Sequence, residues 1–563
     1  MKGCLRIVWA LFGLICLLLA SGCGKSTDID SAPGAQENGV LSASAGQVAV
    51  TPAGSLLTPY AAARVADQVS FGATPALTAE LSKKGLEAWI SDQYALPVSL
   101  ITAPEWVINF DENDRVAFEK ASGHLEGSYY DLLLSAPDQL RLRVSWALFS
   151  FIPVNGKVKT YGVLEHVNLL QRHAFGNYRA FLRELSIHPA MGFFLDNVQN
   201  RATSPECPNC AANENYAREL LQLFSLGVVM LNPDGTIVRD AKGKPIETYD
   251  QEDVEALAKA LTGWRSAPSS TPLPMTNFLN AGHLMVPDSW RAAHDWNAKM
   301  VMGVSFPAGR DASKELDAVV DLLMNHQNIA PFVSLRLIQH LVTSDPSPAY
   351  VARVSGVFRN NGSGAAGDMK AVIRAVLLDP EARKSDTNDG KASAQIGKFR
   401  EPLHWYTAAV RGLNCKRAMR DPNGRIVHPT EQNALNPSTV FGFYLPTDRA
   451  PGSNLLAPEQ KLVNTSELSS RFGGWPIGLL DNSSNGNNDS GCQIDELARL
   501  LERSPKEFVD SLNTLYFRGV MPPLLRASIL DLAAGQTTWG NPRSKAVRLL
   551  QYALSSPAFG VMK

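Results

Sequence analysis

Two cysteines three residues apart, Cys207 and Cys210, are the first residues whose spacing could carry chemistry. A Cys-x-x-Cys pair can be a redox dithiol, half of a zinc site, or a disulfide that tightens a loop. A redox pair has its reactive cysteine at a helix N-terminus, whereas Cys210 lies three residues before the expected N-cap, Asn213. A zinc site would need Cys415 and Cys492 as further ligands. We therefore predict a small disulfide between Cys207 and Cys210.

Two carboxylates follow this pair in the phrase NENYAREL. Glu214 would lie in the first helical turn, where an acidic side chain suits the helix dipole. Glu219 is five residues further on and faces another side of the helix, while Arg218 is four residues on and can pair with Glu214. The structural interpretation is a capped helix with an ion pair. The functional interpretation places Glu214 or Glu219 in a pocket as an acid, base or ligand, and the sequence does not separate the two.

The histidines are spaced too widely for a metal site on one helix. His166 and His173 are seven residues apart, which is two helical turns or about 10 Å. A metal site would have to gather side chains from several segments, as helical bundles can. The candidate residues for such a metal or catalytic site are His173, His188, Asp196, Glu219, His294 and Asp295. The alternative is that these side chains bond to backbone or carboxylate groups at helix ends.

The phrase HDWNAK is the best single candidate for a functional surface. It brings His294, Asp295 and Lys299 together with Trp296, and Trp290 lies just upstream. Aromatic faces beside hydrogen-bonding groups suit a sugar or a small amphipathic ligand. The alternative is a loop that its tryptophans pack onto the body of the protein. The chain has no G-x-S-x-G nucleophile elbow and no P-loop, so we expect no nucleotide cofactor.

The N-terminus predicts secretion. Lys2 and Arg6 precede the apolar run VWALFGLICLLLA, which ends in small residues and Cys23. This is the pattern of a secretory signal, and the apolar run is too short for a stable membrane span. A cysteine directly after small residues resembles a bacterial lipobox, in which Cys23 carries the lipid that holds the protein to the membrane. The alternative is an ordinary signal cut nearby.

The expected organisation follows from this interpretation. Residues 1–22 are the signal peptide, residues 23–56 form a lipidated and flexible tether rich in Gly, Ser, Ala and Pro, and residues 57–563 form one large domain. Because residue 24 is Gly rather than Asp, the outer membrane is the expected address in the envelope of a cell with two membranes. The protein would face the periplasm or the exterior.

The remaining cysteines suit an oxidising compartment. Four are left once the signal peptide and the lipidated residue are set aside, and four cysteines permit three pairings. The simplest pairing is Cys207 with Cys210 and Cys415 with Cys492. The composition is globular, with 45% hydrophobic and 19% charged residues. A net charge of −1 gives no field that would attract nucleic acid.

The apolar residues repeat mostly with the period of a helix. The predicted fold is mostly α, a large multi-helix, bundle-like domain with one small β-hairpin at 228–249 and long irregular loops at 265–310 and 414–457. A domain sub-boundary could lie in the second loop. The predicted helices cover 77–94, 138–152 after a short turn, 162–189, 214–227, 251–264, 312–325, 329–343, 347–358, 367–379, 397–413, 458–470, 494–503, 505–516, 522–534 and 543–556.

Several phrases occur in a fixed order along the chain. They are RVADQVSFGATP (64–75), HAFGNYRAFLRELSIHPAMGFFLDNVQNR (173–201), NENYARELLQLFSLG (213–227), YDQEDVEALAKALTGW (249–264), HDWNAK (294–299), LIQHLVTSDPSPAYVARV (337–354), LLDPEAR (377–383), KFREPL (398–403) and NPSTVFGFYLPTDRAPGSNLLAPE (436–459). Together they resemble the bacterial family DUF1800, apart from Asp67 and Gln68, where basic residues are common. The resemblance implies a secreted helical protein, often encoded beside another uncharacterised secreted family, and it supplies no catalytic residues.

Two hypotheses follow from the sequence. The first is a non-catalytic envelope protein that binds a partner or an exported polymer in a groove covered by the long loops. The second is a secreted metal-assisted hydrolase or oxidoreductase that uses His, Glu and Asp gathered from several helices. The first is favoured because no compact catalytic spacing stands out. Convergence of His173, His188, Glu219 and His294 on one cavity would favour the second.

Overall fold

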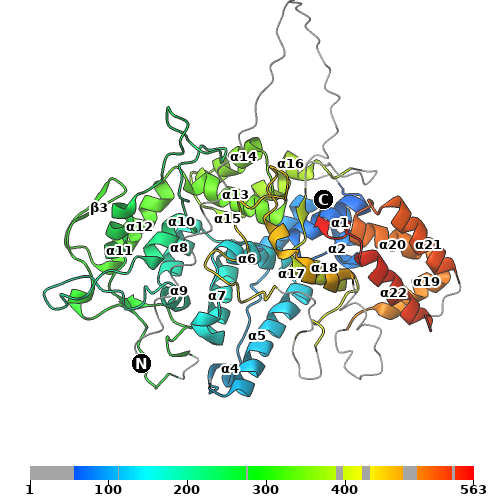
Figure 1. The fold of residues 1–563 in the computed structure, drawn as a ribbon, viewed down its shortest axis with the longest axis horizontal. Coiled ribbons are helices and arrows are strands. Elements are labelled where there is room, and N and C mark those ends of the chain that lie inside the picture. Colours follow the sequence, from blue (N-terminus) through cyan, green and yellow to red (C-terminus); the bar gives the residue numbers. More distant parts are fainter. Residues whose placement is uncertain are drawn as a thin grey trace, which may run out of the picture. The chain divides into compact units, whose positions relative to one another are not determined.

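The computed structural model describes residues 56–562, except 112, 274–276, 388–396, 421–425, 427–431, 473–490 and 536–538. Over these residues the chain is mostly α-helical and has three two-stranded sheets, so the predicted fold class is confirmed (Figure 1). The expected signal, Cys23 and nearly all of the tether lie outside the described residues. None of the helices described is long and apolar enough to cross a membrane.

The helices follow one another along the chain with short connections in most places. In the first half they are α1 (Pro59–Val69), α2 (Pro75–Lys84), α3 (Leu86–Ala95), α4 (Glu105–Ile108), α5 (Arg115–Ser135), α6 (Gln139–Phe151), η1 (Gly156–Val158), α7 (Lys159–His173), α8 (Tyr178–Ser186), α9 (Pro189–Phe194), α10 (Asn215–Gln222) and α11 (Gln251–Ala260). In the second half they are η3 (Arg291–Ala293), α12 (Ala312–Asn325), α13 (Ile329–Leu341), α14 (Pro348–Arg359), α15 (Met369–Leu378), α16 (Pro380–Arg383), α17 (Pro402–Arg411), η4 (Pro458–Leu462), α18 (Thr465–Phe472), α19 (Ile494–Arg503), α20 (Pro505–Phe517), α21 (Pro523–Ala534) and α22 (Pro542–Leu554).

Many of these helices begin at a capping residue followed by proline. The cap side chain accepts a hydrogen bond from the first turn, and proline at the first helical position loses nothing because its missing N–H would have no partner there. This start occurs at Thr58, Thr74, Ser347, Asp379, Ser504 and Asn541. Local sequence therefore sets where these helices begin.

Three predicted helices are broken in the structure, and the one expected over 458–470 forms η4 (Pro458–Leu462) and α18 (Thr465–Phe472) instead. The helix expected over 77–94 ends at Gly85, whose φ of 76° separates α2 from α3. The helix expected over 162–189 forms α7, α8 and α9 instead. At the first break Asn177 caps α8, and the Tyr178 N–H donates to the Gly367 carbonyl at 2.8 Å. The break between α7 and α8 thus allows a backbone hydrogen bond to Gly367, which lies just before α15.

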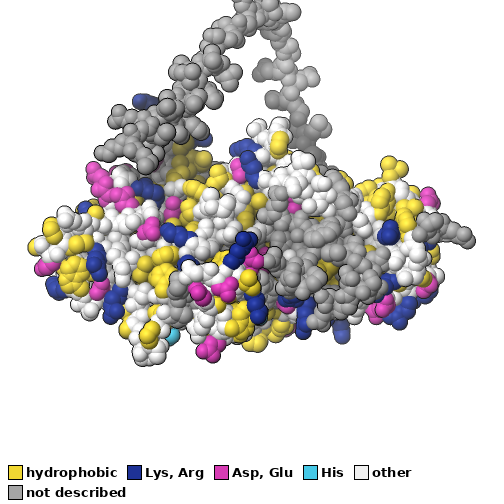
Figure 2. Space-filling view, turned by 60° about the horizontal axis from the view of Figure 1, so that its bottom comes forward, with side chains coloured by type: hydrophobic (Ala, Val, Ile, Leu, Met, Phe, Trp, Pro, Cys, Tyr) yellow, Lys and Arg dark blue, Asp and Glu magenta, His cyan; other side chains and the backbone are white. Residues whose placement is uncertain are grey.

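Helix α6 forms the centre of the core. All of its residues from Gln139 to Phe151 are buried, as expected of a helix surrounded by others (Figure 1). It packs against α1, α3, α5, α7 and α13. Helices α19 to α22 form a further group that joins the rest through α1 and α20. The surface in Figure 2 mixes acidic and basic side chains over its described part.

The small sheets differ from the single hairpin that was predicted. The sheets pair β1 (Trp264–Arg265) with β2 (Val286–Pro287), β3 (Lys299–Val301) with β4 (Val304–Phe306), and β5 (Lys398–Phe399) with β6 (Val561–Met562). The segment 228–249 is instead a meander of isolated bridges with turns at Gly235 and Gly243. It doubles back twice because its sequence holds two Gly turns, not one.

The four cysteines form the two disulfides that were predicted, Cys207–Cys210 and Cys415–Cys492. They close loops of very different size, with sequence separations of 3 and 77 residues. In the chain-entropy description, a disulfide that closes a long loop lowers the entropy of the unfolded chain more than one that closes a short loop. The second disulfide therefore contributes more to stability.

Removing the long-range disulfide is expected to cost more than removing the local one. The double change Cys415→Ser and Cys492→Ser should lower the free energy of unfolding by about 4 kcal/mol, and the same change at Cys207 and Cys210 by about 2 kcal/mol. Urea denaturation of both variants measures the difference. Equal losses, or a larger loss for the local pair, would contradict this account.

Candidate groove and the placement of the predicted residues

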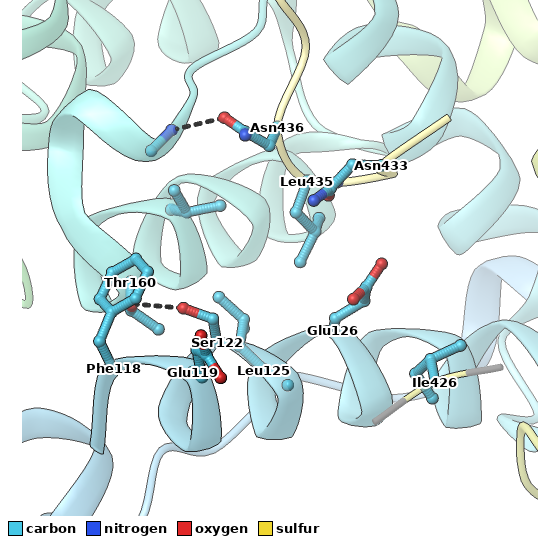
Figure 3. A pocket seen from close by; sticks show the side chains of 13 residues that line it. Phe118, Glu119, Ser122, Leu125, Glu126, Thr160, Ile426, Asn433, Leu435 and Asn436 are labelled. Carbon is cyan, nitrogen blue, oxygen red and sulfur yellow. Dashed lines mark hydrogen bonds between the residues drawn. The ribbon is translucent and has the colours of Figure 1, made fainter. Parts of the chain in front are cut away.

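A partly open cavity of ≈ 470 Å³ lies between α5, the start of α7 and the segment 433–436 (Figure 3). We call it the groove. Its lining residues are Phe118, Glu119, Ser122, Gly123, Leu125, Glu126, Gly156, Thr160, Val163, Ile426, Asn433, Leu435 and Asn436. The last four belong to the 414–457 loop, which was expected to line or cover something.

Helix α5 forms one wall of the groove. Asp114 caps this helix by accepting hydrogen bonds from the N–H groups of Val116 and Ala117. Glu119, Ser122 and Glu126 then recur at intervals of three and four residues, which places them on one face. The two carboxylate residues are two helical turns, or about 10 Å, apart along this face.

The segment 433–436 forms the opposite wall. The Asn436 side-chain oxygen accepts a hydrogen bond from the Gly156 N–H at 2.9 Å, which fastens the segment to the start of α7 (Figure 3). The Asn433 side-chain oxygen accepts from the Leu435 N–H at 3.2 Å. Each amide uses its oxygen within the protein, and each has NH₂ donors in addition. In Figure 3 Glu126 and Asn433 point toward each other from the two walls.

Between these walls the surface is partly polar and partly apolar. The hydroxyls of Ser122 and Thr160 lie 3.4 Å apart and link α5 to α7. Leu125 and Leu435 add apolar surface, and Phe118 is 41% exposed at the edge. None of the thirteen lining residues is Lys, Arg, His or Cys. The groove therefore offers amides, hydroxyls, carboxylates and one aromatic ring, without a thiol or imidazole nucleophile.

The HDWNAK loop is anchored by buried polar side chains, while Asn297 and Ala298 of the same phrase are exposed. His294 and Asp295 are only 6% and 9% exposed. The His294 ring has Nε2 at 2.9 Å from the Glu315 carboxylate and Nδ1 at 2.9 Å from the Thr262 carbonyl oxygen. Lys299 donates to the same carboxylate at 2.9 Å. The loop is thus fixed to α12 through a buried cluster in which one carboxylate faces two basic side chains.

The other candidate residues lie in separate surroundings. His173 on α7 is 2.7 Å from Glu184 on α8, and this contact lowers the pKa of Glu184. His188 is buried beside His166, with ring centroids 6.0 Å apart, and burial lowers the pKa of His188. Burial also raises the pKa of Glu219.

Asp196 and Glu214 have polar partners near the surface. Asp196 pairs with Lys157 at 3.2 Å, and Glu214 forms the predicted ion pair with Arg218 at 2.7 Å. The structure does not bring His173, His188, Glu219 and His294 together. No group of three or more His, Cys, Asp or Glu in the described part of the chain is placed to hold a metal ion.

A buried group that was not predicted from the sequence consists of Arg143, Glu401 and His404, each 0% exposed. A signal for it exists, because Glu401 and His404 form a Glu-x-x-His pair at the start of α17. Residues three apart on a helix share a face. A search of the whole chain for this spacing would have found the pair inside the phrase KFREPLH.

A glycine run that resembles a nucleotide-binding fingerprint was also passed over. Gly362 to Gly367 reads G-x-G-x-x-G, but it connects α14 to α15. The fingerprint needs a strand before it and a βαβ unit around it. This run follows a helix, so it does not have that structural context.

Comparison with known proteins gives a family and no described relative. A family model with the description "Protein of unknown function (DUF1800)" matches residues 64–561. No curated protein and no solved structure matches the chain. Since the family match covers most of the chain, the chain belongs to the DUF1800 family.

Proposed function

We propose that this protein binds a neutral polyhydroxylated ligand, such as a segment of an exported glycan, in the groove and leaves it chemically unchanged. The observation that carries this proposal is the lining of the groove. Amide, hydroxyl and carboxylate groups from α5, α7 and the segment 433–436 face one space, with the Phe118 ring at its edge.

The size and chemistry of the groove support a sugar-like ligand. Its volume of ≈ 470 Å³ lies in the usual range for small-ligand sites. Carboxylate oxygens accept hydrogen bonds from hydroxyl groups, and the amide NH₂ groups of Asn433 and Asn436 donate to them. An aromatic ring at the edge can pack against the apolar face of a sugar.

The charge of the groove argues against an anionic ligand. Glu119 and Glu126 line it, and no Lys or Arg is among its lining residues. Glu119 is partly neutralised by Arg115 at 2.8 Å, but the carboxylates on this wall still disfavour phosphates, acidic polysaccharides and nucleic acids. A neutral glycan, or one that carries amino groups, fits this field better.

The alternative is a secreted metal-assisted hydrolase or oxidoreductase built from His, Glu and Asp. It would need these residues to meet in one cavity. The candidates from the sequence instead contact Glu184, His166 and Glu315 in separate places. The binding function therefore has the stronger support.

The proposal is tested by titrating the purified chain with neutral, amino and acidic oligosaccharides, using calorimetry. We expect saturable binding to at least one neutral or amino oligosaccharide and none to the acidic ones. Mass spectrometry of the recovered oligosaccharide should show an unchanged ligand. Binding to acidic oligosaccharides alone, or a cleaved ligand, would contradict the proposal.

We also propose that the protein is anchored in the cell envelope by a lipid on Cys23, in the outer membrane where two membranes are present. The signal-like residues before Cys23 and the Gly- and Ser-rich tether after it support this. Labelled palmitate should be incorporated by the wild-type chain and not by a Cys23→Ser variant, which should leave the membrane fraction. Equal labelling of both chains would contradict the anchor.

A further inference from the structure

The two walls of the groove present different hydrogen-bonding groups. In the segment 433–436, the Asn433 side-chain oxygen accepts from the Leu435 N–H at 3.2 Å, and the Asn436 side-chain oxygen accepts from the Gly156 N–H at 2.9 Å. Because only the oxygen of an amide can accept from an N–H, these two bonds determine how each side-chain amide is oriented. The NH₂ group of each amide, which has two donors, is therefore the part that this wall offers to a ligand.

The opposite wall, on α5, presents acceptors. Glu119 and Glu126 line it, and an ionised carboxylate only accepts hydrogen bonds. Arg115 donates to Glu119 at 2.8 Å, whereas Glu126 points across the groove toward Asn433 (Figure 3). A carboxylate has about four acceptor sites, so Glu126 can accept from a ligand in addition to its contacts within the protein.

Apolar side chains line the space between the two walls. They are Leu125 of α5, Val163 of α7, and Leu435, whose side chain extends from the segment 433–436 toward α5 (Figure 3). A ligand that places a methyl group against these side chains removes apolar surface from water, which favours binding. The groove thus combines a donating wall, an accepting wall and an apolar contact surface.

This separation of donors from acceptors fits an amide better than a hydroxyl group. A hydroxyl donates and accepts at one oxygen, so it can bind to either wall. In a trans secondary amide the C=O and N–H groups point in opposite directions, so one group can bind to both walls at once. An acetamido group also carries a methyl group for the apolar surface. An ammonium group only donates, so it cannot accept from the two asparagines.

We propose that the groove recognises the acetamido group of an N-acetylated sugar within a glycan chain. The Asn433 NH₂ group donates to the acetamido carbonyl, the acetamido N–H donates to Glu126, and the methyl group packs against Leu125 and Leu435. This inference rests on the proposed function for the binding of a glycan, and it adds the class of sugar. Asn433 is then a residue that determines specificity.

A peptide also has trans amides, but the edge of the groove favours a sugar. Phe118 lies there and is 41% exposed, so its ring can pack against the apolar face of a sugar ring whose substituent enters the groove. A peptide ligand is therefore treated as an outcome that would contradict the inference.

The test is calorimetric titration of the purified chain with three tetrasaccharides. They share one β-1,4-linked backbone and differ only at carbon 2 of each ring, which carries an acetamido, an amino or a hydroxyl group (the tetramers of N-acetylglucosamine, glucosamine and glucose). We expect the acetylated tetramer to bind at least about tenfold more tightly than the other two. Without the acetamido group, polar groups of the two walls lose their partner.

An Asn433→Asp variant tests the assigned donor. Aspartate keeps an oxygen that accepts from the Leu435 N–H, and it replaces the NH₂ donor with a second acceptor. Affinity for the acetylated tetramer should fall at least about tenfold, while affinity for the amino tetramer should rise. The control is Asn209→Asp, which makes the same change of charge at an exposed asparagine outside the groove and should bind as wild type does.

The outcomes separate this inference from the groove function. If the glucose tetramer binds wild type as tightly as the acetylated one, or if Asn433→Asp leaves the affinity for the acetylated tetramer unchanged, the inference is wrong and the groove function stands. If no neutral or amino oligosaccharide binds, the groove function fails and the inference fails with it. If an N-acetylated tripeptide displaces the acetylated tetramer at equal affinity, the ligand is a peptide and the inference is wrong.

Discussion

Replacing Asp67 with Asn is expected to lower the free energy of unfolding by about 3–5 kcal/mol. The Asp67 carboxylate is 2.5 Å from Arg400 and 3.0 Å from Arg518, and all three side chains are at most 2% exposed. An amide cannot balance two buried guanidinium charges, so both arginines would remain uncompensated in the interior. Urea denaturation at neutral pH measures the loss.

A surface pair provides the matched control. Asp92 is also an aspartate within hydrogen-bond distance of a basic side chain, 2.7 Å from Lys84, but its side chain is 61% exposed. Replacing Asp92 with Asn should cost less than about 1 kcal/mol, because water replaces the lost partner. If the Asp67 variant were no less stable than the Asp92 variant, the buried cluster would not have the importance given to it here.

Lowering the pH from 7.5 to 5.5 is expected to destabilise the protein by about 5 kcal/mol through four buried histidines. Burial lowers the pKa of His166 from 6.5 to about 4 and lowers the pKa values of His188, His340 and His404 well below 6.5. In the unfolded chain they bind protons below pH 6.5, whereas in the folded protein they stay neutral. The stability they contribute is therefore complete above pH 6.5 and is lost as the pH falls toward the folded-state values.

Each histidine accounts for about 1.4 kcal/mol of this loss over the whole range from pH 7.5 to 5.5, because its ring in the unfolded chain titrates in the middle of that range. Urea denaturation at pH 7.5, 6.5 and 5.5 gives the total, and a His166→Gln variant should lose about a quarter less, because glutamine can still donate to the Ile152 carbonyl that His166 contacts at 2.8 Å. Stability that stayed constant over this range would contradict the neutral, buried state of these rings.

Local sequence was enough to predict most helices. The predicted helices at 312–325 and 494–503 have the bounds seen in α12 and α19. Local sequence was not enough where a contact with a distant segment of the chain determines where a helix ends. The split between α7 and α8 depends on the hydrogen bond from Tyr178 to Gly367, almost two hundred positions away. No local periodicity encodes such a contact.

The groove could not be predicted from residue spacing for a similar reason. The first part of α5, from Arg115, was not predicted as a helix, so Glu119 and Ser122 had no common face in the sequence analysis. Its other wall lies about three hundred positions away, at Asn433 and Asn436. The expectation that the 414–457 loop lines a binding surface identified one wall of the groove. It did not identify α5 as the opposite wall.

The phrases that carried the family resemblance contain many of the buried charges. Asp67 of the first phrase pairs with Arg400 of KFREPL, and Lys398 of that phrase pairs with Glu459 at 2.9 Å. In the structure these buried charges join segments that are far apart in the chain. A charged residue in one of these phrases can thus stabilise the fold by pairing with a distant segment. Only the three-dimensional structure shows which segment that is.

The binding proposal is tested most directly by filling the groove. Gly123 lies on α5 and lines the groove, and a Cβ added there would meet no atom within 4 Å. A Gly123→Trp variant should therefore place its ring in the groove without disturbing the helix, because glycine is a poor helix former. The control is Gly356→Trp, at an equally open glycine in α14, which does not line the groove.

The measurement is calorimetric titration of both variants with the oligosaccharide that wild type binds, together with their unfolding temperatures. We predict that Gly123→Trp binds at least about tenfold more weakly than wild type, that Gly356→Trp binds as wild type does, and that both unfold near the wild-type temperature. Wild-type affinity in the Gly123→Trp variant would contradict the claim that this groove is the binding site.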